Sequence, residues 1–462
     1  MAIQNVLILG MGGIGFHIAK RLTHEGYSVT IVEAEQEAAR YASENLDCRT
    51  IVGSAMEVSS WKKAQAEKMD LVIASTNDDA VNMVAALIAE RFGVRFKIVR
   101  TRSLDFGEET GLLSEKDLTI DLMVHPEELV AQEIARLVQR SAANDVIDIG
   151  GGQMRVLALR VEEGSPLANK QLVEISQIYN EFLFRVVAVG RGITTIIPGG
   201  QTVILPLDQV FILARSEDIP KLMELMGIKQ QSIHNLMILG GGLIGSRIAQ
   251  LLEKTVQIKL IEKDVKRAEE LASTLTSTKV LNGDGTDANV LALAGLLDME
   301  TFIATTGDNE TNIISCLLAK HLINKQHRDP GGSRGKTIAL VNKEDYLVLA
   351  STIGLDIALN AKISAANEIL KFIRRSELLA VAHLHGVDAE VVELVAGHGS
   401  PITKKPLYKQ HSLLENGSIL IGGVFRDNQW QVAVGETHIG NGERVIVVCA
   451  SLNLKKIRKL FR

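Results

Sequence analysis

Short apolar runs alternate with amphipathic stretches along the first part of the chain. The runs predict strands near residues 5–10, 28–33, 49–52, 70–75 and 96–101, with helices between them. Each run is almost wholly apolar rather than apolar at every second position, which is typical of parallel strands covered on both faces. Strands that alternate with helices predict right-handed crossovers, and therefore an α/β fold with a doubly wound parallel sheet.

The first run leads into a glycine-rich turn. The turn consists of Gly10, Met11, Gly12, Gly13, Ile14 and Gly15, and an amphipathic stretch follows it. In a Rossmann unit, Gly10 turns tightly, Gly12 lets the backbone approach a pyrophosphate, and Gly15 lets the helix pack on the strand. The N-terminus of that helix offers N–H groups to an anion. The next strand ends in Glu33, in the position of a ribose ligand, so we expect a bound adenine nucleotide; the alternative is a Rossmann-like turn that has lost its ligand.

The same pattern returns in the second half of the chain. The turn reappears as Gly240, Gly241, Gly242, Leu243, Ile244 and Gly245, and Glu262 closes the next strand as Glu33 does. Asn312 follows Asn82 at the same interval that separates Gly245 from Gly15. Further along, Ser400 follows Ser165, and Arg426 follows Arg191, at an interval that is longer by five. The sequence is therefore an internal duplication, and we expect the insertion in the polar loop at 326–335.

Each half is expected to hold two domains joined by a crossover helix. We expect Rossmann nucleotide-binding domains at 1–122 and 234–354, and small α+β lobes at 143–228 and 375–462. The crossover helix opens at His125 with a proline near its first turn and carries an apolar stripe that includes Leu129 and Ile134. Such a stripe is core or, between two domains, a dimer face. Its counterpart is expected at about 357–373.

Composition excludes several classes of protein. The chain has 462 residues, of which 46% are hydrophobic and 4% aromatic, and its net charge is −5, which gives no footprint for nucleic acid. Cys48, Cys316 and Cys449 are far apart and not in metal-binding spacing, so we expect reduced structural thiols and no metal site. No apolar run approaches the roughly 18 residues of a membrane span. The sequence opens directly on an apolar run that predicts a strand, so we expect no signal peptide.

Polar residues follow several of the expected strands. Ser54, Thr76, Asn77 and Arg100 come at the carboxyl ends of their strands, where doubly wound sheets bind ligands. The guanidinium of Arg100 is suited to a charged fork on a phosphate. The alternative is a solvated arginine in the sequence Arg100-Thr101-Arg102.

Over nearly its whole length the sequence resembles the TrkA family, the cytosolic subunits of bacterial Trk potassium uptake systems with tandem RCK (or KTN) domains. The resemblance rests on the glycine turn, on Thr76-Asn77-Asp78-Asp79, on the stretch 98–103, on Pro126-Glu127-Glu128, and on Ser165-Pro166-Leu167 and Gly200-Gln201-Thr202 in the lobe. Each motif is common by itself; their order and duplication are specific.

The resemblance implies two nucleotide sites. The first would include the turn from Gly10, Glu33, Thr76, Asn77 and Arg100; the second would include the turn from Gly240, Glu262, Thr306 and Gly307, with Asn342 at the place of Arg100. Many RCK domains have Gly-Asp after the third strand. The second half keeps Asp284 there, whereas the first has Ser54. An added carboxylate repels a polyphosphate unless a sugar hydroxyl or a cation intervenes, so we expect the two sites to prefer different nucleotides, or one to be structural.

The resemblance also implies a regulator rather than an enzyme. Its expected ligands are NAD(H) and ATP or ADP, and its expected assembly is a ring, a tetramer of this chain, on the inner face of the cell membrane beneath a potassium channel of the TrkH type. A regulator of another cation transporter or antiporter is the alternative. A dehydrogenase would need a proton donor with an orienting partner beside the nicotinamide, and neither His125 nor His398 has such a partner at a telling spacing.

Overall fold

The structure is a computed structural model. It describes residues 3–106, 114–139, 145–161, 163–179, 182–226, 233–326, 335–375, 378–384, 386–410, 414, 418–450 and 453–462. Two compact units emerge from the contacts within the chain. One consists of Met1–Val130 with Ala361–Glu377, and the other consists of Ala131–Asn360 with Leu378–Arg462.

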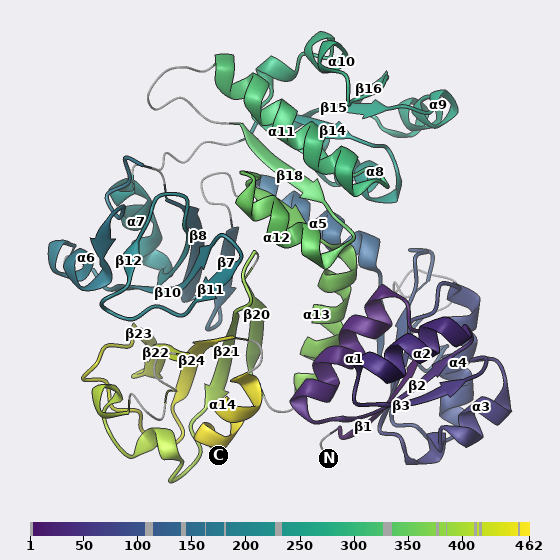
Figure 1. Cartoon of the computed structure of the whole chain (residues 1–462), viewed down its shortest axis with the longest axis horizontal. Helices are drawn as coiled ribbons and strands as arrows, with labels where there is room; N and C mark the ends of the chain where they lie inside the picture. The colour runs from purple at the N-terminus through teal and green to yellow at the C-terminus, as the bar shows by residue number, and fades with distance from the viewer. Residues whose placement is uncertain are drawn as a thin grey trace. The chain divides into compact units, whose positions relative to one another are not determined.

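The first unit is built on a parallel sheet with the strand order β3-β2-β1-β4-β5-β6. Its strands are β1 (Asn5–Leu9), β2 (Ser28–Glu33), β3 (Arg49–Val52), β4 (Leu71–Ala74), β5 (Phe96–Arg100) and β6 (Leu122–Val124). Its helices are α1 (Gly13–Glu25), α2 (Gln36–Asn45), α3 (Val58–Lys63), α4 (Asp79–Arg91) and α13 (Ala361–Arg374) (Figure 1). The order changes direction beside β1, so the glycine turn after β1 lies at the switch point where such sheets bind ligands.

Apolar side chains cover both faces of this sheet, as the continuous apolar runs predict. One buried cluster includes Ile8, Ile18, Ala42 and Ile73, and so joins α1 and α2 to the strands. A second cluster includes Leu7, Trp61, Val72 and Ala86, and so joins α3 and α4 to the opposite face. The expectation of a doubly wound sheet is confirmed.

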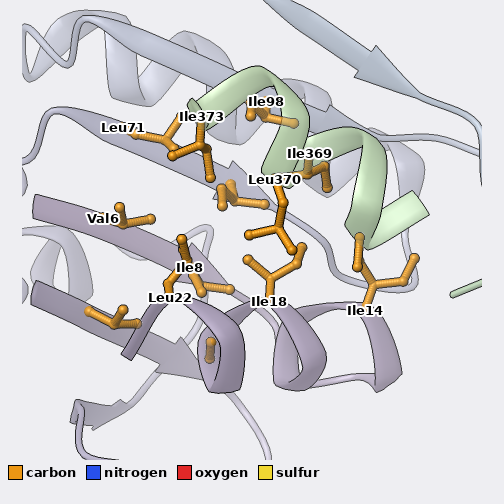
Figure 2. Close-up of a cluster of buried hydrophobic side chains, with 14 of the residues drawn as sticks. Val6, Ile8, Ile14, Ile18, Leu22, Leu71, Ile98, Ile369, Leu370 and Ile373 are labelled. Atoms are coloured by element: carbon orange, nitrogen blue, oxygen red, sulfur yellow. The ribbon is translucent and has the colours of Figure 1, made fainter. Parts of the chain in front are cut away.

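The second crossover helix, α13, packs against α1 of the first nucleotide domain. The buried contact consists of Ile14, Ile18 and Leu22 from α1 and Ile369, Leu370 and Ile373 from α13 (Figure 2). At its far end Arg374 forms an ion pair with Glu25. A helix from one repeat therefore completes the core of the other repeat's nucleotide domain, which the sequence pattern does not indicate.

The second parallel sheet repeats the first, with the order β16-β15-β14-β17-β18-β19. Its strands are β14 (Asn235–Leu239), β15 (Gln257–Glu262), β16 (Lys279–Asn282), β17 (Thr301–Ala304), β18 (Lys336–Leu340) and β19 (Ile357–Leu359). Its helices are α8 (Leu243–Leu252), α9 (Val265–Thr274), α10 (Ala288–Leu293), α11 (Asn309–Gln326) and α12 (Glu344–Thr352). The first crossover helix, α5 (Pro126–Gln139), ends beside this sheet, where the Leu137 carbonyl accepts a hydrogen bond of 2.9 Å from Nζ of Lys336.

The two small lobes contain mainly antiparallel strands. The first has β7 (Asp145–Ile149), β8 (Met154–Arg160), β9 (Lys170–Gln171), α6 (Leu172–Ile178), β10 (Phe184–Arg191), β11 (Thr194–Ile196), β12 (Val203–Ile204), β13 (Gln209–Arg215) and α7 (Ile219–Leu225). The second has β20 (Ala380–His383), β21 (Glu390–Val395), β22 (Ile419–Arg426), β23 (Gln429–Val432), β24 (Arg444–Cys449) and α14 (Leu454–Phe461). A single buried cluster that includes Met154, Phe211, Trp430 and Ile446 joins the two lobes. The lobes therefore pack as a pair.

The duplication is visible in matched ion pairs of the lobes. Arg191 pairs with Asp208 at 2.6 Å, and its Nη2 donates to the Val203 carbonyl. Arg426 pairs with Glu443 at 2.7 Å, and its Nη2 donates to the His438 carbonyl. All three positions repeat at one interval along the chain, as the sequence predicts for Arg191 and Arg426.

Two expectations about the end of the nucleotide domains are corrected. β6 and β19 extend the parallel sheets beyond residues 122 and 354, and the sequence did not indicate either strand. Residues 357–359 form β19, so the crossover helix begins at Ala361 and not at 357. These strands are only three residues long, and such a short run gives no clear periodicity.

The cysteines are free thiols, as expected. Cys316 and Cys449 are buried, Cys48 is half-buried, and burial raises the pKa of the Cys316 thiol well above its ordinary value. Within the described ranges, no helix has both the length and the apolar character that a membrane span requires.

Candidate functional site

The glycine turn of the first sheet has the shape that a pyrophosphate requires. Gly10 has a φ of +93°, and a Cβ built there would lie 3.0 Å from the backbone of Thr76. A Cβ on Gly15 would lie 2.1 Å from the Gly10 carbonyl oxygen, so this position keeps α1 close to β1. A Cβ on Gly12 would meet only Oδ1 of Asn77, at 4.0 Å. Gly12 therefore faces open space at the start of α1, and the three glycines have the separate geometries that the sequence predicts.

The second turn has the same geometry. Gly240 has a φ of +95°, and a Cβ on Gly245 would lie 1.9 Å from the Gly240 carbonyl oxygen. A Cβ on Gly242 would meet nothing within 4 Å. The structure thus contains two turns in which the middle glycine is exposed beside a helix N-terminus, where backbone N–H groups attract an anion.

The acid at the end of each second strand is fixed against its turn. Glu33 accepts hydrogen bonds from the N–H of Met11 at 2.5 Å and of Glu35 at 2.8 Å. Glu262 accepts the matching pair from Gly241 at 2.7 Å and Asp264 at 2.9 Å. A carboxylate has about four acceptor positions, so each acid retains capacity for the two hydroxyls of a ribose.

The far wall of each site is held by an asparagine that the sequence showed only as a marker of the repeat. Oδ1 of Asn82 accepts hydrogen bonds from the N–H and the hydroxyl of Thr76, at 2.9 and 2.7 Å. Its Nδ2 donates to the carbonyls of Thr76 and Arg100, both at 3.0 Å. Asn312 makes the same four bonds, to Thr306 and to the carbonyl of Leu340. These buried amides fix the loop after the fourth strand of each sheet opposite the glycine turn.

Arg100 lies beneath the first site. Only 8% of the residue is exposed, so the alternative interpretation of Arg100 as a solvated side chain is wrong. Its Nη1 donates to the Thr76 carbonyl at 2.9 Å and to Oδ1 of Asn77 at 3.2 Å. The pKa of this guanidinium is lowered, mainly by burial; the nearby carboxylates of Glu127 and Asp79 act in the opposite direction. Arg100 therefore holds Asn77 toward Gly12 and brings a positive charge to the floor of the site.

Asn342 does not occupy the place of Arg100 in the second half. The amide of Asn82 reaches the carbonyl of Arg100, and the amide of Asn312 reaches that of Leu340. The equivalent of Arg100 is therefore Leu340, and Asn342 corresponds to Arg102. The N–H of Arg102 donates to Asp79, and that of Asn342 donates to the matching Asn309.

The two repeats differ in length on both sides of Arg100. The interval between equivalent residues is not constant along the chain: it grows by ten between Asn82 and Arg100, and it shrinks by five between Arg100 and Val124, whose equivalent is Leu359. The gain thus falls before β18 and the loss before β19. Some of the ten extra residues lengthen α11, which has 18 residues where α4 has 13. Residues 327–334, in the loop where the insertion was expected, lie outside the described residues.

The second site differs from the first at matched positions. Gly307 and Leu340 replace Asn77 and Arg100, so the second site lacks the counterparts of that amide and that buried guanidinium. The guanidinium of Arg267 lies at the second turn instead, where its Nε donates to the Gly241 carbonyl at 3.1 Å. Asp284 pairs with Lys263 at 2.8 Å and accepts a hydrogen bond from the Thr286 hydroxyl, and these contacts hold its pKa well below the ordinary value.

The first half has Ala34 and Ser54 in place of Lys263 and Asp284, and Ser54 accepts a hydrogen bond from the N–H of Met56. The sequence showed the extra carboxylate but not the lysine beside it. The expected repulsion of a polyphosphate is therefore offset by Lys263.

The described residues contain no cluster of three or more His, Cys, Asp or Glu side chains that could hold a metal ion. The glycine turns have the geometry that suits an anion, and the acids Glu33 and Glu262 have the acceptor positions that suit a diol.

Comparison with known proteins agrees with this geometry. The model of the TrkA-N domain matches residues 6–126 and 236–361, and that of the TrkA-C domain matches residues 156–227. A protein from Halomonas elongata named "Trk system potassium uptake protein TrkA" is 30% identical over 462 residues, which cover 99% of both chains.

Two solved structures share the fold. The GsuK channel bound to NAD has a TM-score of 0.59 at 18% identity, over 99% of this chain and 79% of that one. GsuK bound to ADP has a TM-score of 0.51 at 15% identity, over 81% of this chain and 70% of that one.

Proposed function

Because the chain belongs to the TrkA family of Trk potassium uptake systems, we propose that it is a nucleotide-sensing regulatory subunit that gates a membrane potassium channel of the TrkH type. The observation that carries the proposal is the pair of exposed middle glycines, Gly12 and Gly242, each at a helix N-terminus and each faced by a fixed acid. The potassium channel as partner is inferred from membership of the family.

The ligands follow from the two ends of each site. A helix N-terminus and an exposed glycine suit a pyrophosphate, and Glu33 or Glu262 suits a ribose. NAD(H), ATP and ADP all have both groups. NAD and ADP bound to GsuK, a channel with the same fold, support this choice of ligands. The first site, with Arg100 beneath it, is the better candidate for a ligand of higher phosphate charge.

The proposed assembly and location come from the family. Two nucleotide domains, which extend through β6 and β19, and two small lobes form one protomer, and four protomers form a ring on the cytoplasmic face of the membrane. A nucleotide changes the channel only if it binds two arrangements of the ring with unequal affinity. The chain itself performs no chemistry on the nucleotide.

Two measurements test the proposal. Calorimetric titration of the full chain with NADH and ADP should show binding, and Gly12→Ala with Gly242→Ala should abolish it. Pull-down of the tagged chain from detergent-solubilised membranes should recover a potassium channel subunit. Recovery of a cation antiporter would replace the channel with the other class of transporter, and absence of nucleotide binding would contradict the sensing role.

A further inference from the structure

The helices α1 and α13 run side by side in the same direction. Glu25 and Arg374, at their C-terminal ends, form an ion pair. Twelve residues earlier in each helix, at their N-terminal ends, Lys362 lies over Gly13. A Cβ built on Gly13 would be 2.5 Å from Cδ of Lys362 and 3.1 Å from its Nζ. The lysine thus passes over the first turn of α1 at a position where the lack of a side chain leaves room for it.

This placement brings an ammonium group to the nucleotide end of α1. Gly13 is the first residue of the helix and follows Gly12, the glycine that faces open space. Lys362 is an exposed residue, and its Nζ lies 3.1 Å from a Cβ built on Gly13. A flexible lysine that reaches a helix N-terminus beside an exposed glycine is a common way to bind phosphate, because the ammonium adds charge to the backbone N–H groups.

The second half has neither partner of this contact. Leu243 stands at the position of Gly13, and Glu127 stands at the position of Lys362, since Val124 and Leu359 are equivalent residues at the ends of β6 and β19. A bulky side chain and an acid thus replace a glycine and a base. The contact is specific to the first site, as are Arg100 and Asn77.

We propose that Lys362 is a phosphate ligand of the first nucleotide site, contributed by the second repeat of the chain. This inference rests on the proposed nucleotide site at Gly12. Lys362 binds the terminal phosphate of an adenine nucleotide, and its contribution to the binding free energy grows with the charge of that phosphate. α13 begins two residues after β19 and is followed by the second small lobe, so it connects the two parts of the second repeat. A nucleotide that binds Lys362 therefore also stabilises the packing of this helix against α1.

The test is titration of the full chain, carrying Gly242→Ala to silence the second site, with ADP and with adenosine. Lys362→Met keeps the aliphatic stem over Gly13 and removes the charge. We expect it to weaken ADP binding by about tenfold or more, the value of a hydrogen bond to a charged group, and to leave adenosine binding unchanged. Lys362→Arg should retain most of the affinity for ADP.

Each outcome separates this inference from the function on which it rests. If the chain with an intact Lys362 binds neither ligand, the nucleotide site itself is wrong. If it binds ADP, and Lys362→Met binds ADP with equal affinity, only the role of Lys362 is wrong. Equal losses for ADP and adenosine would also overturn it, because they indicate a structural role. Gly13→Ala is a second variant: it displaces the lysine stem, and should weaken ADP more than adenosine.

Discussion

Glu25 and Arg374 form a buried ion pair that joins the last residue of α1 to the last residue of α13. Their side chains are 6% and 3% exposed, and Nε of Arg374 donates to Oε2 of Glu25 at 3.2 Å. Two residues 349 positions apart in the sequence are thus paired inside one domain core. The contact fixes the second crossover helix to the first nucleotide domain.

Glu25→Ala should therefore destabilise this unit strongly. It leaves the guanidinium of Arg374 buried without its carboxylate, which costs about 3–5 kcal/mol of unfolding free energy. Urea unfolding, with hydrogen exchange of α1 and α13 as a local probe, measures the loss. Arg40→Ala removes an exposed i,i+4 pair with Glu44 on α2 and is the control, with an expected cost of less than about 0.5 kcal/mol. Equal effects of the two variants would mean that the buried pair does not hold α13.

Gly12→Ala should weaken nucleotide binding without unfolding the protein. Gly12 has φ −63° and ψ 179°, which alanine adopts readily, and a Cβ there meets no protein atom closer than 4.0 Å. The methyl group instead fills the space of the pyrophosphate. Calorimetry with NADH measures the loss, in a chain whose melting temperature is unchanged. Gly15→Ala is the contrasting variant, because its Cβ would lie 2.1 Å from a carbonyl oxygen and should destabilise the fold. Undiminished binding of NADH to Gly12→Ala would refute the first site as assigned.

Lys263→Met should raise the pKa of Asp284. The hydrogen bond from Lys263 is the largest cause of the lowered pKa, and the Thr286 contacts that remain keep it below the ordinary value. A carboxyl with a lowered pKa in the folded state stabilises the protein above its ordinary pKa, and that stabilisation is lost as the pH falls. NMR titration of the carboxyl carbon measures the shift, with the exposed Lys266→Met on α9 as the control. An unchanged pKa in Lys263→Met would show that the ion pair does not form in solution.

The chain should show no hydride transfer. Purified protein with NADH or NAD and a panel of small oxo- and hydroxy-acids should leave the nicotinamide absorbance unchanged. Glu33 and Glu262 accept hydrogen bonds from backbone N–H groups at the glycine turns, and we propose them as ribose acceptors and not as catalysts. The control is a known dehydrogenase in the same mixture. Sustained turnover with any substrate would overturn the regulatory role.

The parallel sheets and the glycine turns were predictable because their signals are local. An apolar run, a glycine turn and a closing acid such as Glu33 lie within about one βαβ unit of roughly 30 residues, and the duplication repeats the signal. The strands around Leu7 and Met237 are buried from their second residue on, as the pattern requires.

The exchange of α13 was not predictable, because it depends on contacts between residues far apart in sequence. The apolar stripe with Ile369 and Ile373 indicates a buried face but not which domain covers it. The same limit applies to Lys263 beside Asp284 and to Lys362 over Gly13. The matching of Arg100 with Asn342 was wrong because the interval between the repeats grows before β18. The hydrogen bonds of Asn82 and Asn312 and the registers of β5 and β18 locate this change.

The most direct test of the account is potassium flux in proteoliposomes that contain the cognate channel and this chain, measured over a range of ATP/ADP ratios. Flux should follow the ratio with the wild-type chain, Arg100→Ala should flatten the response, and Gly12→Ala should abolish it. Gly242→Ala should retain most of it, because Leu340 leaves the second site without the buried guanidinium. A response that survives both Gly12→Ala and Arg100→Ala unchanged, and disappears in Gly242→Ala, would contradict the account.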